Sequence, residues 1–186
     1  MRKLISLLSL LSVLAGYNGD ALAASSARTL KVTKTVEISA PASKVWHIID
    51  DFNALHRWLP TIEETQITKG QNNKPGAIRL LSLRAGGTVE QKLLAYDADG
   101  MSYTYNILRG VLPVSDYEST IKVEPAGRNQ TKVNWTSTFR RKDTGDKPAP
   151  GADDKAAIKA VSSAYQAGLT NLKRIAERDN SGRNKK

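Results

Sequence analysis

Residues 101–124, MSYTYNILRGVLPVSDYESTIKVE, decide the fold, because two alternating stretches lie on either side of the turn signal Gly110 to Pro113. A period of two predicts β-strands with one buried face. A connection this short joins antiparallel strands, since parallel ones need a long crossover. The side chains predicted to face inward are Tyr103, Tyr105, Ile107, Tyr117, Ser119 and Ile121.

The same pattern continues on both sides of this hairpin, interrupted by turn signals such as Gly86-Gly87 and Pro125 to Asn129. Strands recur about every dozen residues, which leaves no room for the crossover helices that parallel pairing needs. We therefore predict a seven-stranded antiparallel sheet. Its strands are expected at residues 30–39, 62–68, 76–84, 88–97, 101–109, 114–124 and 130–141.

Helical spacing follows the first strand and returns at the end of the chain. Two short helices are expected, one from Pro41 to Phe52 and one from Asn53 to Leu59. Residues 153–178 carry an apolar stripe with the period of a long helix. A sheet with one face to cover and a helix with a matching stripe predict an α+β fold, with a curved sheet around the C-terminal helix. A hollow between them is where such folds place ligands.

The chain begins with the layout of a secretory signal peptide. Arg2 and Lys3 precede the apolar run Leu4 to Ala15, and Ala21-Leu22-Ala23 has the small residues of a cleavage site. The run is shorter than the roughly 20 apolar residues of a membrane span. We predict a signal peptide at 1–23 and a periplasmic or secreted protein. The remaining predicted parts are a linker at 24–29, one domain at 30–178 and a disordered basic tail at 179–186.

The composition excludes several kinds of chemistry. The 186 residues contain no cysteine, so disulfides, thiolate metal sites and cysteine nucleophiles are absent. Only two histidines occur, His47 and His56, both on the short helices and without a third ligand nearby. We interpret His47 as partly buried and His56 as a surface residue, and we predict neither a metal site nor a cofactor. No phosphate-binding glycine loop occurs.

The ordered motifs of the chain resemble one known family. The run Val36 to Trp46 (VEISAPASKVW), then Asp51-Phe52 and Trp58 to Pro60, is similar to the opening of the START/Bet v 1-like (SRPBCC) superfamily. Within it, the chain resembles an exported bacterial member of the polyketide cyclase/dehydrase and lipid transport family, over roughly residues 32–177. The resemblance implies a helix-grip fold with a hydrophobic cavity. Members of the family include ligand carriers, hormone receptors and aromatase/cyclases.

Alternation along the strands, together with the helix stripe, predicts the residues that line this cavity. The set is apolar and aromatic, with hydroxyls and one amide, and it contains no carboxylate, lysine or histidine. A general base needs a pKa near the working pH, and tyrosine is far from it. We therefore predict no catalytic residue. The predicted lining is Val89, Gln91, Leu93, Tyr103, Tyr105, Ile107, Tyr117, Ser119, Trp135, Ser137, Phe139, Val161, Tyr165 and Leu169, with Ala95 also facing inward.

Two loops are expected at the same end of neighbouring strands. Their glycines permit hinge conformations, and Val111 and Leu112 would give an apolar lid. In the receptor relatives, the corresponding loops resemble a gate and a latch over the cavity. The alternative is that both loops are ordinary turns. The residues assigned to the two gate loops are Arg84, Gly86, Gly87, Gly110, Val111, Leu112 and Pro113.

Three functions fit these observations. The favoured one is an exported protein, monomeric, that binds a hydrophobic or amphiphilic small molecule without transforming it. The first alternative is a small cyclase or dehydratase that polarises a carbonyl with Gln91, Tyr103, Tyr105 and Tyr117.

The second alternative is an accessory protein whose basic surface docks an acidic periplasmic protein or an anionic membrane surface. Lysine and arginine number 28 against 18 acidic residues, a net charge of +10, and cleavage would remove Arg2, Lys3 and Asp20 to leave +9. Export argues against nucleic acid as the partner. In this hypothesis Arg140 and Arg141 are solvated. The other basic residues assigned to the surface are Lys31, Lys34, Lys69, Lys74, Arg79, Lys142 and Lys147.

Overall fold

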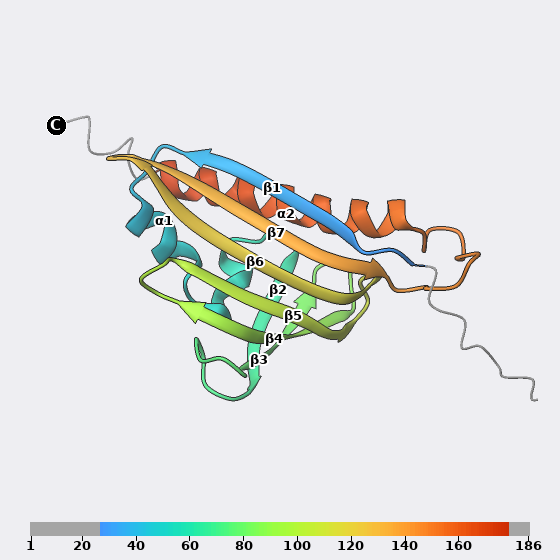
Figure 1. The fold of residues 1–186 in the computed structure, drawn as a ribbon. Coiled ribbons are helices and arrows are strands. Elements are labelled where there is room, and N and C mark those ends of the chain that lie inside the picture. Colours follow the sequence, from blue (N-terminus) through green and yellow to red (C-terminus); the bar gives the residue numbers. More distant parts are fainter. Residues whose placement is uncertain (1–26, 179–186) are drawn as a thin grey trace, which may run out of the picture.

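The sheet is antiparallel throughout, with the strand order β1-β7-β6-β5-β4-β3-β2. It curves around the long C-terminal helix in the computed structural model, as Figure 1 shows. The structure describes residues 27–178. The predicted signal peptide at 1–23, residues 24–26 of the predicted linker and the tail at 179–186 lie outside the described residues. Within 27–178, no helix is long and apolar enough to cross a membrane.

The observed elements confirm the predicted α+β fold class. Most element boundaries lie within two residues of their predicted positions. The strands and helices follow one another in the predicted order. Two differences are larger: β6 continues three residues past its predicted end at 124, and α1 ends three residues before the predicted end at Phe52. The elements are β1 (Leu30–Ile38), α1 (Ala42–Ile49), η1 (Phe52–Arg57), β2 (Ile62–Lys69), β3 (Ile78–Leu83), β4 (Thr88–Asp97), β5 (Ser102–Gly110), β6 (Val114–Gly127), β7 (Gln130–Arg141) and α2 (Asp154–Arg178).

Chain order explains the topology. Strands β2 to β7 pair with their sequence neighbours through short turns, while α1 and η1 separate β1 from β2. The first strand therefore pairs with β7 and becomes the opposite edge of the sheet. Helix α2 follows β7 and lies across the concave face (Figure 1). Its buried residues are the predicted stripe, Val161, Tyr165, Leu169 and Leu172 among them.

Alternation predicted the buried face correctly along most strands. Tyr103, Tyr105 and Ile121 are buried, as the period of two requires. Ala95 is an exception, because it is exposed. The register between β4 and β5 shifts between Leu93 and Ala95. A bulge of this kind reverses the faces beyond it. Tyr96 then packs against Trp46, with ring centroids 5.8 Å apart.

Helix α2 packs tightly against the sheet and the η1 region at Gly168. A Cβ atom there would lie about 3 Å from the side chains of Leu59, Trp58 and Trp135, so only glycine fits without displacement. The two tryptophans also contact each other, with ring centroids 5.3 Å apart. At this level the helix, η1 and the sheet are in direct contact. Any hollow between sheet and helix is therefore confined to one end of the groove.

The prediction that Arg141 is solvated is wrong. Its side chain donates to Asp154 Oδ1 at 2.9 Å, to the Asp143 carbonyl at 2.6 Å and to the Gly145 carbonyl at 2.7 Å. Only 8% of the residue is exposed. The loop that follows β7 folds back over the end of the strand, and the first turn of α2 brings Asp154 to meet the guanidinium. Arg141 thus anchors this loop to the helix.

Candidate functional site

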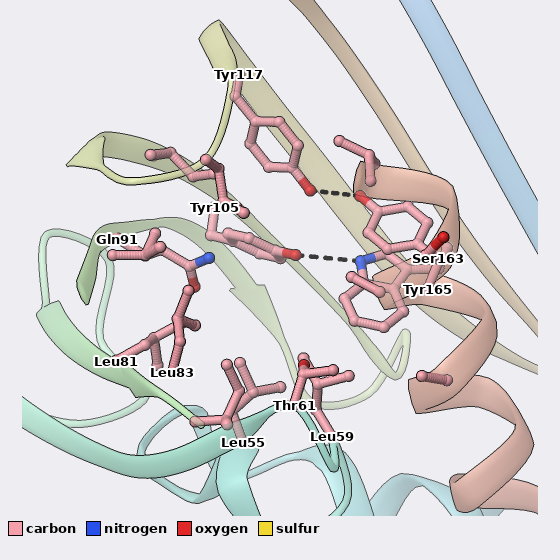
Figure 2. Close-up of a pocket in the computed structure, with 18 of the residues that line it drawn as sticks. Leu55, Leu59, Thr61, Leu81, Leu83, Gln91, Tyr105, Tyr117, Ser163 and Tyr165 are labelled. Carbon is pink, nitrogen blue, oxygen red and sulfur yellow. Dashed lines mark hydrogen bonds between the residues drawn. The ribbon is translucent and has the colours of Figure 1, made fainter. Parts of the chain in front are cut away.

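A cavity of about 410 Å³ lies between the sheet and α2, at the end where the β3–β4 and β5–β6 turns meet. This volume falls within the range of small-molecule sites. Figure 2 shows side chains from the sheet, from η1 and from α2 converging on it. Its lining residues are Leu55, Leu59, Thr61, Ile62, Leu81, Leu83, Ala85, Val89, Gln91, Tyr105, Ile107, Leu112, Tyr117, Trp135, Val161, Ser163, Ala164, Tyr165 and Ala167.

The structure brings eight of the predicted cavity residues together around this space. They are Val89, Gln91, Tyr105, Ile107, Tyr117, Trp135, Val161 and Tyr165.

The other predicted cavity residues are buried away from it. Tyr103 lies too deep, where aromatic rings from α1 and η1 fill the groove: Phe52 and Trp46 lie 6.1 and 6.3 Å from the Tyr103 ring. Ser119 is covered by Tyr165 and Trp135, and Phe139 packs behind Tyr117 with ring centroids 5.9 Å apart. The residues that do not line the cavity are Leu93, Tyr103, Ser119, Ser137, Phe139 and Leu169.

The sequence prediction missed one wall of the cavity. Leu55 and Leu59 come from the η1 region, and Leu81 and Leu83 from β3. The sequence did contain a signal for β3: Arg79, Leu81 and Leu83 share one face by alternation. The sequence prediction assigns no inward face to this strand. The contribution of η1 depends on how the short helices fold under the sheet, and a local pattern does not contain that information.

The two predicted gate loops touch over the mouth of the cavity. Ala85 and Leu112 border the cavity itself. A Cβ at Gly87 would lie 2.6 Å from a Val111 methyl carbon, so this glycine is needed for the close approach of the loops. The Val111 N–H donates to the Thr88 carbonyl at 3.1 Å.

The remaining gate-loop residues lie around this contact. Lys142 Nζ donates to the Gly110 carbonyl at 2.9 Å, and Arg84 Nε donates to the Pro60 carbonyl at 3.1 Å. Gly86 and Pro113 lie in the same loops and do not border the cavity. The two loops are in contact, as the two sides of a closed gate would be. That they separate to open the cavity stays a prediction.

A chain of hydrogen-bonded hydroxyl groups joins β6 to α2 along one wall of the cavity. Ser119 Oγ donates to the Thr136 carbonyl at 3.0 Å, so its proton is used there. The Tyr165 hydroxyl, 2.6 Å away, must then donate to Ser119, and the Tyr117 hydroxyl, at 2.5 Å, must donate to Tyr165. Every proton of this chain is therefore already committed to a protein acceptor.

Burial holds these phenols in their neutral form. Desolvation raises the pKa of Tyr117 and of Tyr165 well above 10, because the phenolate would lie in an apolar surrounding. Trp135 stacks on Tyr165 at 4.1 Å between ring centroids and closes off solvent from that side. At neutral pH the cluster cannot accept a proton from a substrate, so it provides structure and hydrogen bonds rather than a general base.

Arg79 lies just below the inner end of the cavity, and its assignment to the surface is wrong. Only 1% of the residue is exposed. Nε and Nη2 both donate to Gln91 Oε1, at 2.9 and 2.7 Å, and Nη1 donates to the Phe52 carbonyl at 2.5 Å. The Phe52 ring lies 3.8 Å from the guanidinium carbon, in cation–π geometry. Arg79 faces inward because it pairs directly with Gln91 across the β3–β4 ladder.

The charge of Arg79 has no counterion among the described residues. No aspartate or glutamate of residues 27–178 forms an ion pair with it. Burial lowers the pKa of the guanidinium, yet arginine starts so high that the group stays charged at neutral pH. Around the positive charge lie the Gln91 amide oxygen, the Phe52 carbonyl oxygen, aromatic rings and the Tyr103 phenol, which interacts with the guanidinium.

The described residues contain no cluster of three or more metal-ligating side chains. His47 is not partly buried as predicted: its side chain is 89% exposed on α1, beside Asp50 at 3.6 Å. His56 is half-buried rather than at the surface. Neither histidine belongs to a cluster of three or more potential metal ligands among the described residues.

Comparison with known proteins agrees with this architecture. Residues 29–177 match the sequence profile of the family described as "Polyketide cyclase / dehydrase and lipid transport". The chain is similar to the MLP-like protein 423 of Arabidopsis thaliana, with 28% identity over 132 residues, 67% of this chain and 81% of that protein.

Two solved structures illustrate the likeness of fold. The protein XoxI from Bacillus cereus has a TM-score of 0.70 and 30% identity, covering 81% of this chain and 97% of that one. The Zhui aromatase/cyclase from Streptomyces sp. R1128 also has a TM-score of 0.70, at 19% identity, covering 81% and 95%. The comparisons confirm the resemblance to the START/Bet v 1-like superfamily and to its polyketide cyclase/dehydrase and lipid transport family; export stays a prediction.

Proposed function

This chain belongs to the polyketide cyclase / dehydrase and lipid transport family, and we propose that it is an exported protein that binds a hydrophobic or amphiphilic small molecule. The observation that carries the proposal is the apolar cavity of about 410 Å³ between the sheet and α2. The volume has room for at least about a dozen non-hydrogen atoms, since a water-sized group takes about 30 Å³.

The apolar lining can supply most of the binding energy. A ligand that buries about a dozen methylene groups gains about 0.8 kcal/mol for each. Association costs about 4–15 kcal/mol. At the lower end of that cost, burial alone supports dissociation constants of roughly tens of micromolar. Tighter binding then depends on the few polar groups that face the ligand.

The lining supports binding without transformation. Its hydroxyl chain is committed to protein acceptors, and its lining side chains include no carboxylate, lysine or histidine. In the cyclase alternative, Gln91 and Tyr105 would polarise a carbonyl. That alternative would gain support from a turnover in a substrate screen that is lost in Tyr105→Phe and Tyr117→Phe.

The binding proposal is tested with N-phenyl-1-naphthylamine, a neutral apolar fluorophore. We expect a dissociation constant of roughly micromolar to tens of micromolar, and a bound apolar ligand in native mass spectra of the purified protein. Ala164→Trp places a large ring in the cavity and should weaken binding of the fluorophore at least about tenfold. Gln166→Trp, exposed on the same helix, is the matched control. A wild-type protein that binds neither this probe nor any co-purified ligand contradicts the proposal.

Export is tested separately from binding. We expect the protein in the periplasmic or extracellular fraction of its own cells, with an intact mass that begins at residue 24. A full-length chain that keeps residues 1–23 and stays in the cytoplasmic fraction would overturn this part of the proposal and leave ligand binding untouched.

A further inference from the structure

The inner end of the cavity contains two hydrogen-bond donors that the protein does not use. A guanidinium can only donate, so the Gln91 amide must turn its oxygen toward Arg79 and its nitrogen away from it. Nε2 makes no hydrogen bond with any other described residue. Gln91 lines the cavity, and Figure 2 shows its amide nitrogen on the side facing Tyr105.

Tyr105 supplies the second donor. Its hydroxyl oxygen lies 3.2 Å from Trp135 Nε1, whose single proton is shared with Ser119 Oγ at 3.0 Å. Because an indole N–H can only donate, the Tyr105 proton has no acceptor among the described residues. The hydroxyl chain of Tyr117, Tyr165 and Ser119 differs in this respect, because its protons end on the Thr136 carbonyl. Within residues 27–178, the donors that remain available at the inner end are Gln91 Nε2 and the Tyr105 hydroxyl.

The layer beneath these two donors is fully packed. Moving inward from the mouth, Leu83, Leu81 and then Arg79 follow one another on the inner face of β3. Val89, Gln91 and Leu93 do the same on β4, and Ile107, Tyr105 and Tyr103 on β5. The cavity therefore ends at the level of Gln91 and Tyr105. A ligand reaching this end meets an amide nitrogen, a phenol and, directly behind them, an uncompensated positive charge.

We propose that the bound molecule is an amphiphile with a carboxylate at one end, and that this carboxylate lies at the inner end of the cavity against Gln91 Nε2 and the Tyr105 hydroxyl. This inference rests on the proposed binding function and specifies its ligand. Arg79 is a positioning residue: it orients the amide and polarises it. An isolated buried charge is costly to the fold, and a ligand carboxylate would supply the missing opposite charge.

The chemistry of the site selects against other polar ends. A primary alcohol can accept from the same donors but lacks the charge that complements Arg79. An ammonium group has no acceptor at this end and is repelled by the guanidinium. The site therefore distinguishes ligands of equal length by their polar end, while the apolar walls treat them alike.

Three ten-carbon probes test this inference on the mature protein at neutral pH: decanoate, decan-1-ol and decylammonium. We expect decanoate to displace N-phenyl-1-naphthylamine at a concentration at least about tenfold below that of decanol, the ratio for a hydrogen bond to a charged group. Decylammonium should displace it least. Decanoate should also shift the side-chain amide resonance of Gln91 further than decanol does.

Gln91→Glu is the sharpest variant, because it keeps the shape of the side chain. The new carboxylate pairs with Arg79, and no amide donor remains. We expect the preference for decanoate over decanol, measured as the ratio of their displacement concentrations, to disappear or reverse. Leu83→Ala, a change in the apolar wall, is the control: it should weaken all probes by a similar factor.

The outcomes separate the two proposals. Fluorophore binding with equal affinity for decanoate and decanol in the wild-type protein overturns the carboxylate inference and leaves the binding function standing. An unchanged preference in folded Gln91→Glu overturns it as well. Absence of any probe binding overturns both. Because the wild-type comparison needs no variant, the inference stays testable even if Gln91→Glu does not fold.

Discussion

Two buried arginines in this protein are compensated in different ways. Arg141, at the end of β7, meets the carboxylate of Asp154 and two loop carbonyls. Arg79, on β3, meets an amide oxygen, a carbonyl oxygen and the Phe52 ring, with no carboxylate among the described residues. The charge of Arg141 is neutralised by Asp154 within the fold, whereas the charge of Arg79 has no neutralising carboxylate among the described residues.

The difference separates a structural role from a functional one. A buried guanidinium with its own carboxylate and backbone acceptors connects two segments of chain, here the loop at 142–153 and the start of α2. A buried guanidinium without a carboxylate contributes less to stability than it costs in desolvation. Its position beneath an open cavity then indicates a role toward a ligand. The following predictions test this contrast by making equivalent changes at the two sites.

The largest effect on stability is expected for Arg141→Met. It removes two charge-assisted hydrogen bonds to backbone carbonyls and leaves Asp154 without its main partner. We expect the free energy of unfolding to fall by about 2–3 kcal/mol, and the Tm by roughly 5–10 °C. Denaturant and thermal unfolding measure it. Arg140→Met is the control on the same strand, since Arg140 has only a 3.8 Å contact with exposed Asp116. Equal effects at 140 and 141 would contradict the anchoring role.

A smaller effect is expected when the Arg79 site is made apolar. Arg79→Met combined with Gln91→Leu removes the desolvated charge together with its main acceptor. We expect the free energy of unfolding to change by less than about 1 kcal/mol, because the relieved desolvation offsets the lost hydrogen bonds. N-phenyl-1-naphthylamine should still bind, with decanoate and decanol now equivalent. A loss of stability as large as that of Arg141→Met would show that Arg79 serves the fold.

Lowering the pH should affect the stability contribution of the Arg141 site but not that of the Arg79 site. The hydrogen bond from Arg141, together with Arg28, holds the pKa of Asp154 below its usual value. A depressed native pKa adds stability above the unfolded pKa, and that stability is lost as the pH falls through the native pKa. The stability difference between wild type and Arg141→Met should therefore shrink between about pH 5 and about pH 2.5. For the Arg79 double variant it should stay constant. Unfolding midpoints across this range are the measurement, and parallel curves for Arg141→Met would contradict the assignment.

The smallest effect is expected at Arg140, whose side chain is only partly buried, with 39% of it exposed. In Arg140→Glu we expect the free energy of unfolding to change by less than about 0.5 kcal/mol, as for other surface charges. If the basic surface docks anionic membranes, retention on vesicles containing anionic lipid should fall in low salt, and the difference should vanish at physiological salt and above. Retention equal to that of wild type in low salt would argue against the docking alternative at this position.

Local patterns were sufficient for the architecture. The alternation of Tyr103, Tyr105 and Ile107, and the stripe of Val161 and Tyr165, are properties of neighbouring residues, and a sheet face or a helix stripe must be buried somewhere. Half of the cavity lining followed from the same reasoning. The exception at Ala95 needed a bulge, which depends on how two strands pair and has no signature in one strand alone.

Sequence patterns were enough to predict the order of strands and helices, the side of most strands that is buried and the apolar character of the groove, because periodicity is local. The position of the hollow could be seen only in the folded molecule, since it depends on the side-chain volumes of α1, η1, β3 and α2 together. The tertiary structure also decided the roles of Arg79 and Arg141. By composition both read as surface charges. Cross-strand pairing with Gln91 turned one toward the cavity, and a returning loop brought Asp154 to the other.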